Sequence, residues 1–195
     1  MRIPVIFFVL IFSIQSVSSQ ELTSTFREKS LQTRQSGMYV LGSWAATNIA
    51  VGSHGWATLK GEDKYFSQMN VMWNTVNISL AVYSLISDAR TDYASMSDKE
   101  FLKKHKQMER VLLINAGLDV GYMLAGAYLT RNAHRLDFDS DLLHGYGNAM
   151  ILQGAFLLVF DLLMYANLKQ QRIKLSDRLT FSPSPIGLRM TFVLD

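Results

Sequence analysis

The sequence predicts an all-α protein: an antiparallel four-helix bundle that spans a membrane, followed by a short strand-like C-terminal tail. Three observations lead to this fold class. The 195 residues are 49% apolar and only 18% charged, below the roughly 25% charged residues of ordinary soluble domains. Four apolar segments follow one another, each near the length that crosses a bilayer. Each of them also contains Asn, Asp or Gln, so polar groups recur inside apolar helices.

Residues 1–19 are predicted to be a signal peptide. Arg2 supplies the positive charge, residues 3–14 are apolar, and small residues follow at 17–19. The alternative is an uncleaved anchor, but the apolar run is short for a membrane span of about 20 residues. The mature chain is therefore expected to be exported, and residues 20–35 are expected to be a polar lead-in.

The bundle itself is predicted over residues 36–175. Short connections favour antiparallel neighbours, and we call the end that holds the mature N-terminus side A and the opposite end side B. Its apolar segments lie at 36–53, 65–86, 110–130 and 144–168.

Local signals predict where the last two helices begin. Ser97 precedes Glu100 by three residues, the spacing of a capping box, and Met96 and Phe101 are placed as in a hydrophobic staple. One residue of the Asp-Ser-Asp run at 139–141 can cap the fourth helix.

Residues 176–195 form the predicted tail. Two prolines are followed by apolar residues that alternate with Gly, Arg, Thr, Val and Asp, which indicates a β-strand or a hairpin. The alternative is an extended segment that lies along the bundle.

A stripe of asparagines marks the second apolar segment. Asn70, Asn74 and Asn77 are spaced by four and three residues, so they share one helical face. Counting residues from side B places the last two level with Asp119, Tyr122 and Gln153, whereas Asn115 and Asp161 lie deeper toward side A. The predicted polar core, also the candidate ligand or proton site, comprises Asn74, Asn77, Asp119, Tyr122, Gln153, Asn115 and Asp161.

This polar core has two interpretations. It can be structural, with interhelical hydrogen bonds worth about 0.6 kcal/mol each that set the register of the helices. It can also form a proton path or a small polar-ligand site, because polar groups inside a membrane often carry function. The first is favoured, since no basic residue accompanies these groups within the apolar segments.

The third helix has a second face of small residues. Gly117, Gly121 and Ala125 lie roughly opposite Asp119 and form a GxxxG-type helix-packing surface. With both faces engaged, we expect this helix to be the most enclosed of the four.

No metal, cofactor or catalytic residue is predicted. The familiar catalytic and nucleotide-binding motifs are absent from the sequence, there is no cysteine, and no two histidines face each other within the apolar segments. Weak metal candidates gather at side B, where the spacing matches no known metal site and helix capping explains the acidic loop. They are His54, His134, His144, Asp137, Asp139 and Asp141.

Basic residues concentrate at side A, which an exported chain would place away from the cytoplasm, opposite to the usual bias of inner-membrane proteins. An anchor with its N-terminus outside, a peripheral location, or the outer membrane would each resolve this conflict. The net charge is only +3 and the Lys and Arg residues form no continuous patch, so nucleic-acid binding is not expected.

Four segments carry a resemblance: LGSWAATNIAVG, YFSQMNVMWNTVN, INAGLDVGYMLAGAYL and GNAMILQGAFLLVFD. Over residues 36–170 the chain resembles an uncharacterised Bacteroidota family of four-helix membrane proteins, a domain of unknown function. The resemblance implies a four-helix membrane protein and supplies no activity or site residue.

The expected function is that of a non-enzymatic integral membrane protein of the cell envelope, a scaffold or accessory subunit of a larger complex. Its expected partners are membrane lipid and either an envelope protein or a second copy of the chain. The alternative is a small-solute or proton pathway centred on Asp119, and an enzyme of unknown reaction comes third. Whether the membrane is the inner or the outer one stays open.

Overall fold

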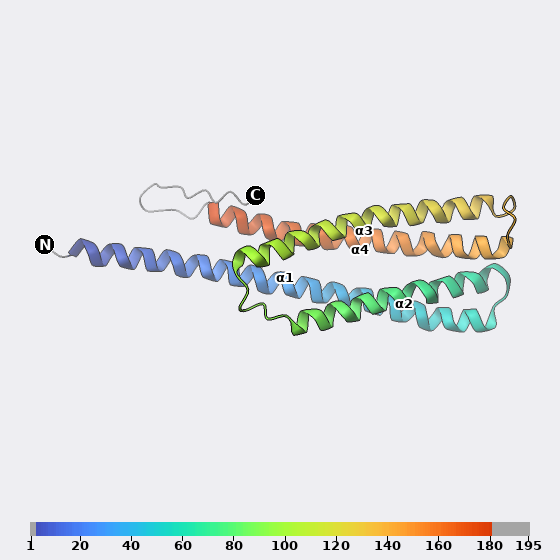
Figure 1. Cartoon of the computed structure of the whole chain (residues 1–195), viewed down its shortest axis with the longest axis horizontal. Coiled ribbons are helices and arrows are strands. Elements are labelled where there is room, and N and C mark those ends of the chain that lie inside the picture. The colour runs from blue at the N-terminus through green and yellow to red at the C-terminus, as the bar shows by residue number, and fades with distance from the viewer. Residues whose placement is uncertain (1–2, 181–195) are drawn as a thin grey trace.

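The computed structural model describes residues 3–180, with side chains described over residues 21–177. This part of the chain folds into four helices, which run alternately in opposite directions (Figure 1). Two connections lie at side B and one at side A. The helices are α1 (Ile3–Thr58), α2 (Gly61–Arg90), α3 (Asp98–Asn132) and α4 (Ser140–Thr180). The predicted all-α fold with four helices is confirmed.

The first and last helices of the chain, α1 and α4, are longer than expected. α1 is one continuous helix of 56 residues, about 84 Å long, and it passes through the predicted signal peptide and lead-in. α4 continues to Thr180, so residues 176–180 are helical where an extended chain was expected. No proline lies between Pro4 and Pro183 to break either helix. Cleavage of the signal peptide stays a prediction, and the tail from residue 181 lies outside the described residues.

The predicted helix starts agree with the observed caps. The Ser97 hydroxyl accepts a hydrogen bond from the Glu100 backbone N–H at 3.3 Å, and Met96 packs against the aromatic cluster that contains Phe101. At the start of α4, the Asp139 carboxylate accepts a hydrogen bond from the Asp141 backbone N–H at 3.0 Å. These side chains satisfy N–H groups that have no partner within the helix.

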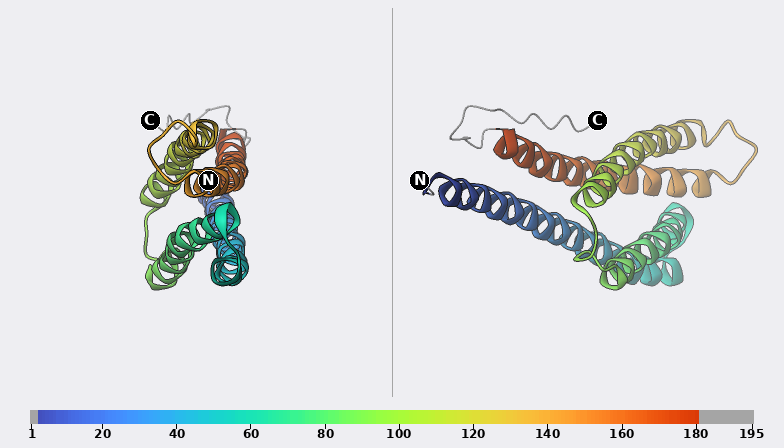
Figure 2. Two further views of the ribbon diagram at one scale, coloured as in Figure 1. Left: turned by 90° about the vertical axis from the view of Figure 1, so that its right-hand side faces the viewer. Right: turned by 60° about the vertical axis from the view of Figure 1, so that its left-hand side comes forward.

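The bundle is a pair of hairpins, α1–α2 and α3–α4, that lie against each other (Figures 1 and 2). α4 is the central helix and contacts all three others, whereas α3 contacts mainly α4. The expectation that α3 is the most enclosed helix was therefore wrong. A Cβ atom added at Gly117 or Gly121 would have no neighbour within 4 Å, and Ala125 is exposed. Within the described chain, the small-residue face of α3 is open.

Other glycines bring the helices together. A Cβ atom on Gly126 of α3 would lie 2.5 Å from the Gly147 carbonyl oxygen of α4. One on Gly145 would lie 2.5 Å from the Glu62 carbonyl oxygen of α2. Contacts this close exclude a side chain, so these glycines set the α3–α4 and α2–α4 crossings near side B.

Two of the described helices, α3 and α4, are long and apolar enough to cross a membrane by length and composition. Only 22% and 28% of their most apolar windows are buried within the chain. A core helix of a soluble protein would be mostly buried, so the apolar surface of these two helices faces outward. α2, and α1 over residues 21–58, do not reach the same apolar content.

Candidate functional site

The asparagine stripe of α2 faces the bundle interior. Asn70, Asn74 and Asn77 are only 3%, 0% and 5% exposed. The Asn70 and Asn74 amides donate to carbonyl oxygens four residues earlier, Phe66 and Asn70, at 2.9 Å. Asn77 donates to the Asn74 side chain at 3.4 Å. One amide N–H of each asparagine is thus used within α2 itself.

Gln153 of α4 connects this stripe to α1. Its side chain is fully buried and donates to Asn70 at 2.5 Å and to Asn48 at 3.4 Å. Its carbonyl oxygen accepts from the Trp44 indole N–H at 3.0 Å. One glutamine of α4 therefore links α4 to both α1 and α2.

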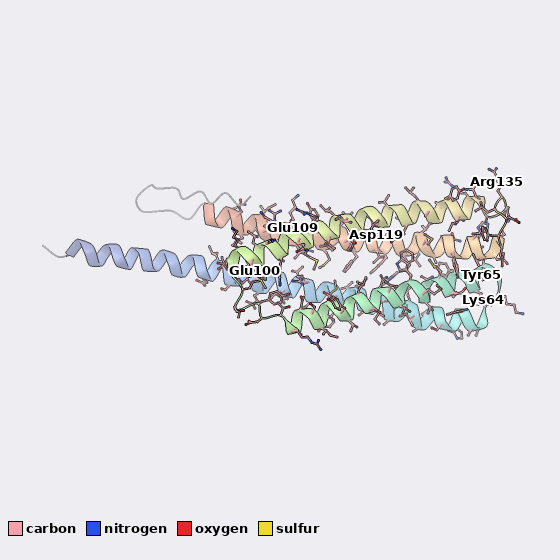
Figure 3. The ribbon with its side chains drawn as sticks, in the orientation of Figure 1. Lys64, Tyr65, Glu100, Glu109, Asp119 and Arg135 are labelled. Atoms are coloured by element: carbon pink, nitrogen blue, oxygen red, sulfur yellow. The ribbon has the colours of Figure 1, made fainter. Side chains whose placement is uncertain are left out.

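Two carboxyl groups meet between α3 and α4. Asp119 and Asp161, 3% and 5% exposed, share a side-chain hydrogen bond. Two carboxylates cannot hydrogen-bond to each other, so this bond requires that one of the two groups is protonated. The second Asp119 oxygen, Oδ2, is buried with no hydrogen-bond partner among the described residues. Figure 3 shows Asp119 about halfway along the bundle, far from the charged residues of both ends.

The other predicted members of the polar core lie farther out. Tyr122 is 37% exposed and its ring meets the Trp73 ring edge-on, with centroids 4.7 Å apart. Asn115 is exposed on α3. Depth counting along the helices had grouped Asp119 with Tyr122 and Gln153, but the contacts pair it with Asp161. Helix rotation, which counting does not address, decides which residues at one depth face each other.

Of the six weak metal candidates at side B, three have contacts of another kind, and His54, Asp137 and Asp141 are exposed. The His134 and His144 rings lie 5.4 Å apart, and His134 Nδ1 is 3.0 Å from the Ser140 hydroxyl. Asp139, besides capping α4, accepts a hydrogen bond from the Tyr65 hydroxyl at 3.0 Å. No three His, Asp or Glu side chains of the described residues lie close enough together to hold a metal ion.

A second polar cluster lies at side A and was not predicted from the sequence. Arg34 of α1 is 2.6 Å from the Asp88 carboxylate of α2, and Asp88 also accepts from the Tyr93 hydroxyl at 2.7 Å. Arg27 is 2.6 Å from Asp98, at the start of α3. These ion pairs join the first three helices.

Its other half joins α1, α3 and α4. His105, 3% exposed, lies 2.7 Å from the Ser30 hydroxyl and 3.0 Å from the Leu168 carbonyl oxygen. Glu109, one turn along α3, receives two hydrogen bonds from Arg172 at 2.7 and 2.9 Å. We call this cluster the side A clamp. It comprises Arg27, Ser30, Arg34, Asp88, Tyr93, Asp98, His105, Glu109 and Arg172.

The clamp disfavours the protonated form of His105. A carbonyl oxygen only accepts, so in neutral His105 Nε2 carries the hydrogen that Leu168 receives, and Nδ1 accepts from the Ser30 hydroxyl. Burial lowers the pKa of His105 below its usual 6.5, and the nearby Arg172 and Arg34 add to this, while the Leu168 bond and Glu109 oppose it. The spacing of Phe101, Leu102, His105 and Glu109 along one face of α3 was the signal that could have revealed the clamp.

The described residues thus offer three kinds of chemistry. The amide layer around Gln153 binds helices together, the Asp119–Asp161 pair can hold or release a proton, and the clamp fixes charges at side A. In the clamp the Ser30 hydroxyl does lie beside the His105 imidazole, the arrangement of a nucleophile and a base. Both residues are buried, at 1% and 3% exposed, so neither is open to a substrate from the surface.

Comparison with known proteins places the chain in a family and no further. No curated protein and no solved structure matches it. Residues 40–162 match a family described as a family of unknown function, DUF6992. The matched segment covers more than half of the chain and includes Gln153, Asp119 and Asp161. The chain belongs to this family of unknown function.

Proposed function

We propose that the protein is an exported, non-enzymatic integral membrane protein of a Bacteroidota-type cell envelope, and that it is a scaffold or accessory subunit of a larger complex. The observation that carries the proposal is the inverted distribution of polarity in the middle of the bundle. Asn74 and Gln153 are fully buried, whereas Leu124 and Leu163 are 67% and 60% exposed. Such an arrangement is unfavourable in water and favourable in lipid.

The scaffold role is supported by the open face of α3. Gly117 and Gly121 would let another helix approach closely, and the described part of this chain does not provide that helix. The basic residues at side A add a second, charged contact region. Neither feature needs a chemical reaction.

Membrane insertion is tested by flotation with vesicles and by extraction at alkaline pH, which removes peripheral proteins. The protein should float and resist extraction. Because the chain has no cysteine, single cysteines at Ser97 and Ser140 then report which side of the membrane each end of the bundle faces. Extraction into the soluble fraction would refute the proposal.

The scaffold role is tested by cross-linking in native membranes. A cysteine at Leu124, on the open face of α3, should give one reproducible cross-linked partner, either another protein or a second copy. A cysteine at Tyr83 of α2, 73% exposed, is the matched control and should give none. Recovery of monomer alone from the Leu124 variant would count against a scaffold.

A proton or small-solute pathway is the second candidate, favoured by the buried Asp119–Asp161 pair. A pathway needs a group that can change charge, whereas a structural pair needs only its hydrogen bond. Asp119→Asn can keep the hydrogen bond to Asp161 and removes the titratable group on which the pathway is centred. In proteoliposomes with a pH gradient, a pathway predicts proton flux that this variant abolishes while folding is retained. Equal flux in both proteins, or none in either, would exclude this function.

A further inference from the structure

We propose that the groove between α1 and α4 holds one acyl chain of an anionic phospholipid, with the headgroup bound by Lys29 and Lys174. This inference rests on the proposed membrane location and adds a specific lipid site to it. α1 and α4 lie side by side toward side A (Figures 1 and 2). The groove between them has a volume of about 500 Å³, within the usual range for small-ligand sites.

The inner part of the groove is apolar. Its walls include Val40 of α1 and Val159 and Leu163 of α4, which are 54%, 58% and 60% exposed, and its floor includes Phe156 and Met164. Gly37 packs directly against Met164, so the two helices touch beneath the groove. An alkyl chain would cover these side chains without needing any hydrogen bond.

The outer part of the groove is polar. Gln32, Thr33 and Ser36 of α1 and Asn167 of α4 line its end toward side A. The groove therefore changes from apolar to polar along its length, in the direction from the bundle centre to side A. A phospholipid changes in the same way from acyl chain to glycerol and headgroup.

Two lysines stand at the polar end. The Gln171 amide donates to the Thr33 hydroxyl at 2.7 Å, so these two residues lie at one level. Lys29 is four residues beyond Thr33, and Lys174 three residues beyond Gln171, both toward side A. At 1.5 Å per residue they stand about 6 and 4.5 Å above that level, on the helical faces that line the groove.

These lysines are available for a ligand. Both are exposed, whereas Arg27, Arg34 and Arg172 form ion pairs within the clamp. Glu28, the acidic neighbour on α1, is turned about 100° away from Lys29 by the helix. Asp177 stands about one turn beyond Lys174 on α4, so the two lysines and this carboxylate together leave the charge at this end of the groove positive, which favours an anionic headgroup over a zwitterionic one.

Trp44 makes the site measurable. Its ring stacks on Phe156, with centroids 3.9 Å apart, and Phe156 lines the groove. The chain has three tryptophans, so Trp56→Phe with Trp73→Phe leaves Trp44 as the only one. Bromine atoms on an acyl chain quench tryptophan fluorescence at short range, so quenching reports a chain in the groove.

The experiment uses the full chain in vesicles with a small mole fraction of brominated lipid. Brominated phosphatidylglycerol should quench Trp44 more than brominated phosphatidylcholine, with a relative binding constant of roughly 25, or about fivefold per lysine. Lys29→Glu with Lys174→Glu should lower this ratio to one or less. Lys99→Glu with Lys103→Glu, also exposed at side A, is the control and should leave the ratio unchanged.

Blocking the groove gives a second measurement. Val159→Phe should reduce quenching by both brominated lipids, whereas Val76→Phe, at a residue 59% exposed on α2, should not. Protein that does not float with the vesicles would refute the membrane proposal. Protein that floats but shows equal quenching by both lipids, or a ratio unaffected by the lysine changes, would refute the lipid site alone.

Discussion

The side A end and the middle of the bundle differ in the kinds of residue that they bury. At side A, Phe26, Phe101 and Leu102 form an apolar core and the buried charges of the clamp are paired, as in a soluble protein. In the middle, amides and carboxyls are buried in addition to an apolar cluster that includes Leu41, Leu112 and Phe160, while many other leucines and valines are exposed. The first pattern is typical of a protein in water, and the second is the one that the proposed membrane location requires.

The largest expected effect comes from the clamp. Glu109→Gln leaves Arg172 without its charge partner, and breaking a buried ion pair costs about 3–5 kcal/mol. Because the Arg172 side chain is 28% exposed, we expect about 3 kcal/mol, measured by thermal unfolding in detergent. Glu28→Gln at an exposed position of α1 is the control and should change stability by less than about 0.5 kcal/mol. A small effect of Glu109→Gln would mean that side A does not behave like a soluble core.

A smaller effect is expected in the middle. Gln153→Leu removes the hydrogen bonds to Asn70, Asn48 and Trp44. At roughly 0.6 kcal/mol per hydrogen bond in membrane bundles, the loss should be about 2 kcal/mol. Gln107→Leu, exposed on α3, is the control. A loss of stability well above that of Glu109→Gln would contradict this ranking. It would mean that Asn70, Asn48 and Trp44 find no other hydrogen-bond partner once Gln153 is replaced.

The clamp also predicts a dependence of stability on pH. Burial lowers the pKa of His105 in the folded state, so the unfolded chain binds the proton more strongly. Stability is then complete above about pH 6.5 and falls as the pH drops below that value, by at most about 1.4 kcal/mol per pH unit. His105→Gln should flatten the curve of melting temperature against pH between 7 and 5. An unchanged slope in this variant would assign the dependence to another group.

The smallest effect on stability is expected at the open face of α3. Gly117→Ala with Gly121→Ala meets no neighbouring atom within the chain and favours the helix, so stability should rise by about 1 kcal/mol or less. Cross-linking through Leu124 should nevertheless fall, because the added methyl groups keep a partner helix at a distance. Gly126→Ala is the contrast, since its methyl group would collide with Gly147 and destabilise the monomer.

Local features were predictable because their causes are local. The absence of proline between residues 4 and 183, the Ser97 cap and the apolar segments determine helices regardless of their neighbours. The spacing of the asparagine stripe likewise determines one polar face on α2. These features were sufficient for the all-α fold and for the resemblance to an uncharacterised family, which the match over residues 40–162 supports.

Contacts between helices were decided only by tertiary structure. The pairing of Asp119 with Asp161, and of Gln153 with Asn70, depends on how each helix is rotated about its axis. Likewise, Gly117 and Gly126 lie on the same helix, yet only Gly126 meets a neighbour. Spacing along a sequence states which residues share a face, but the packing of all four helices together decides what that face touches.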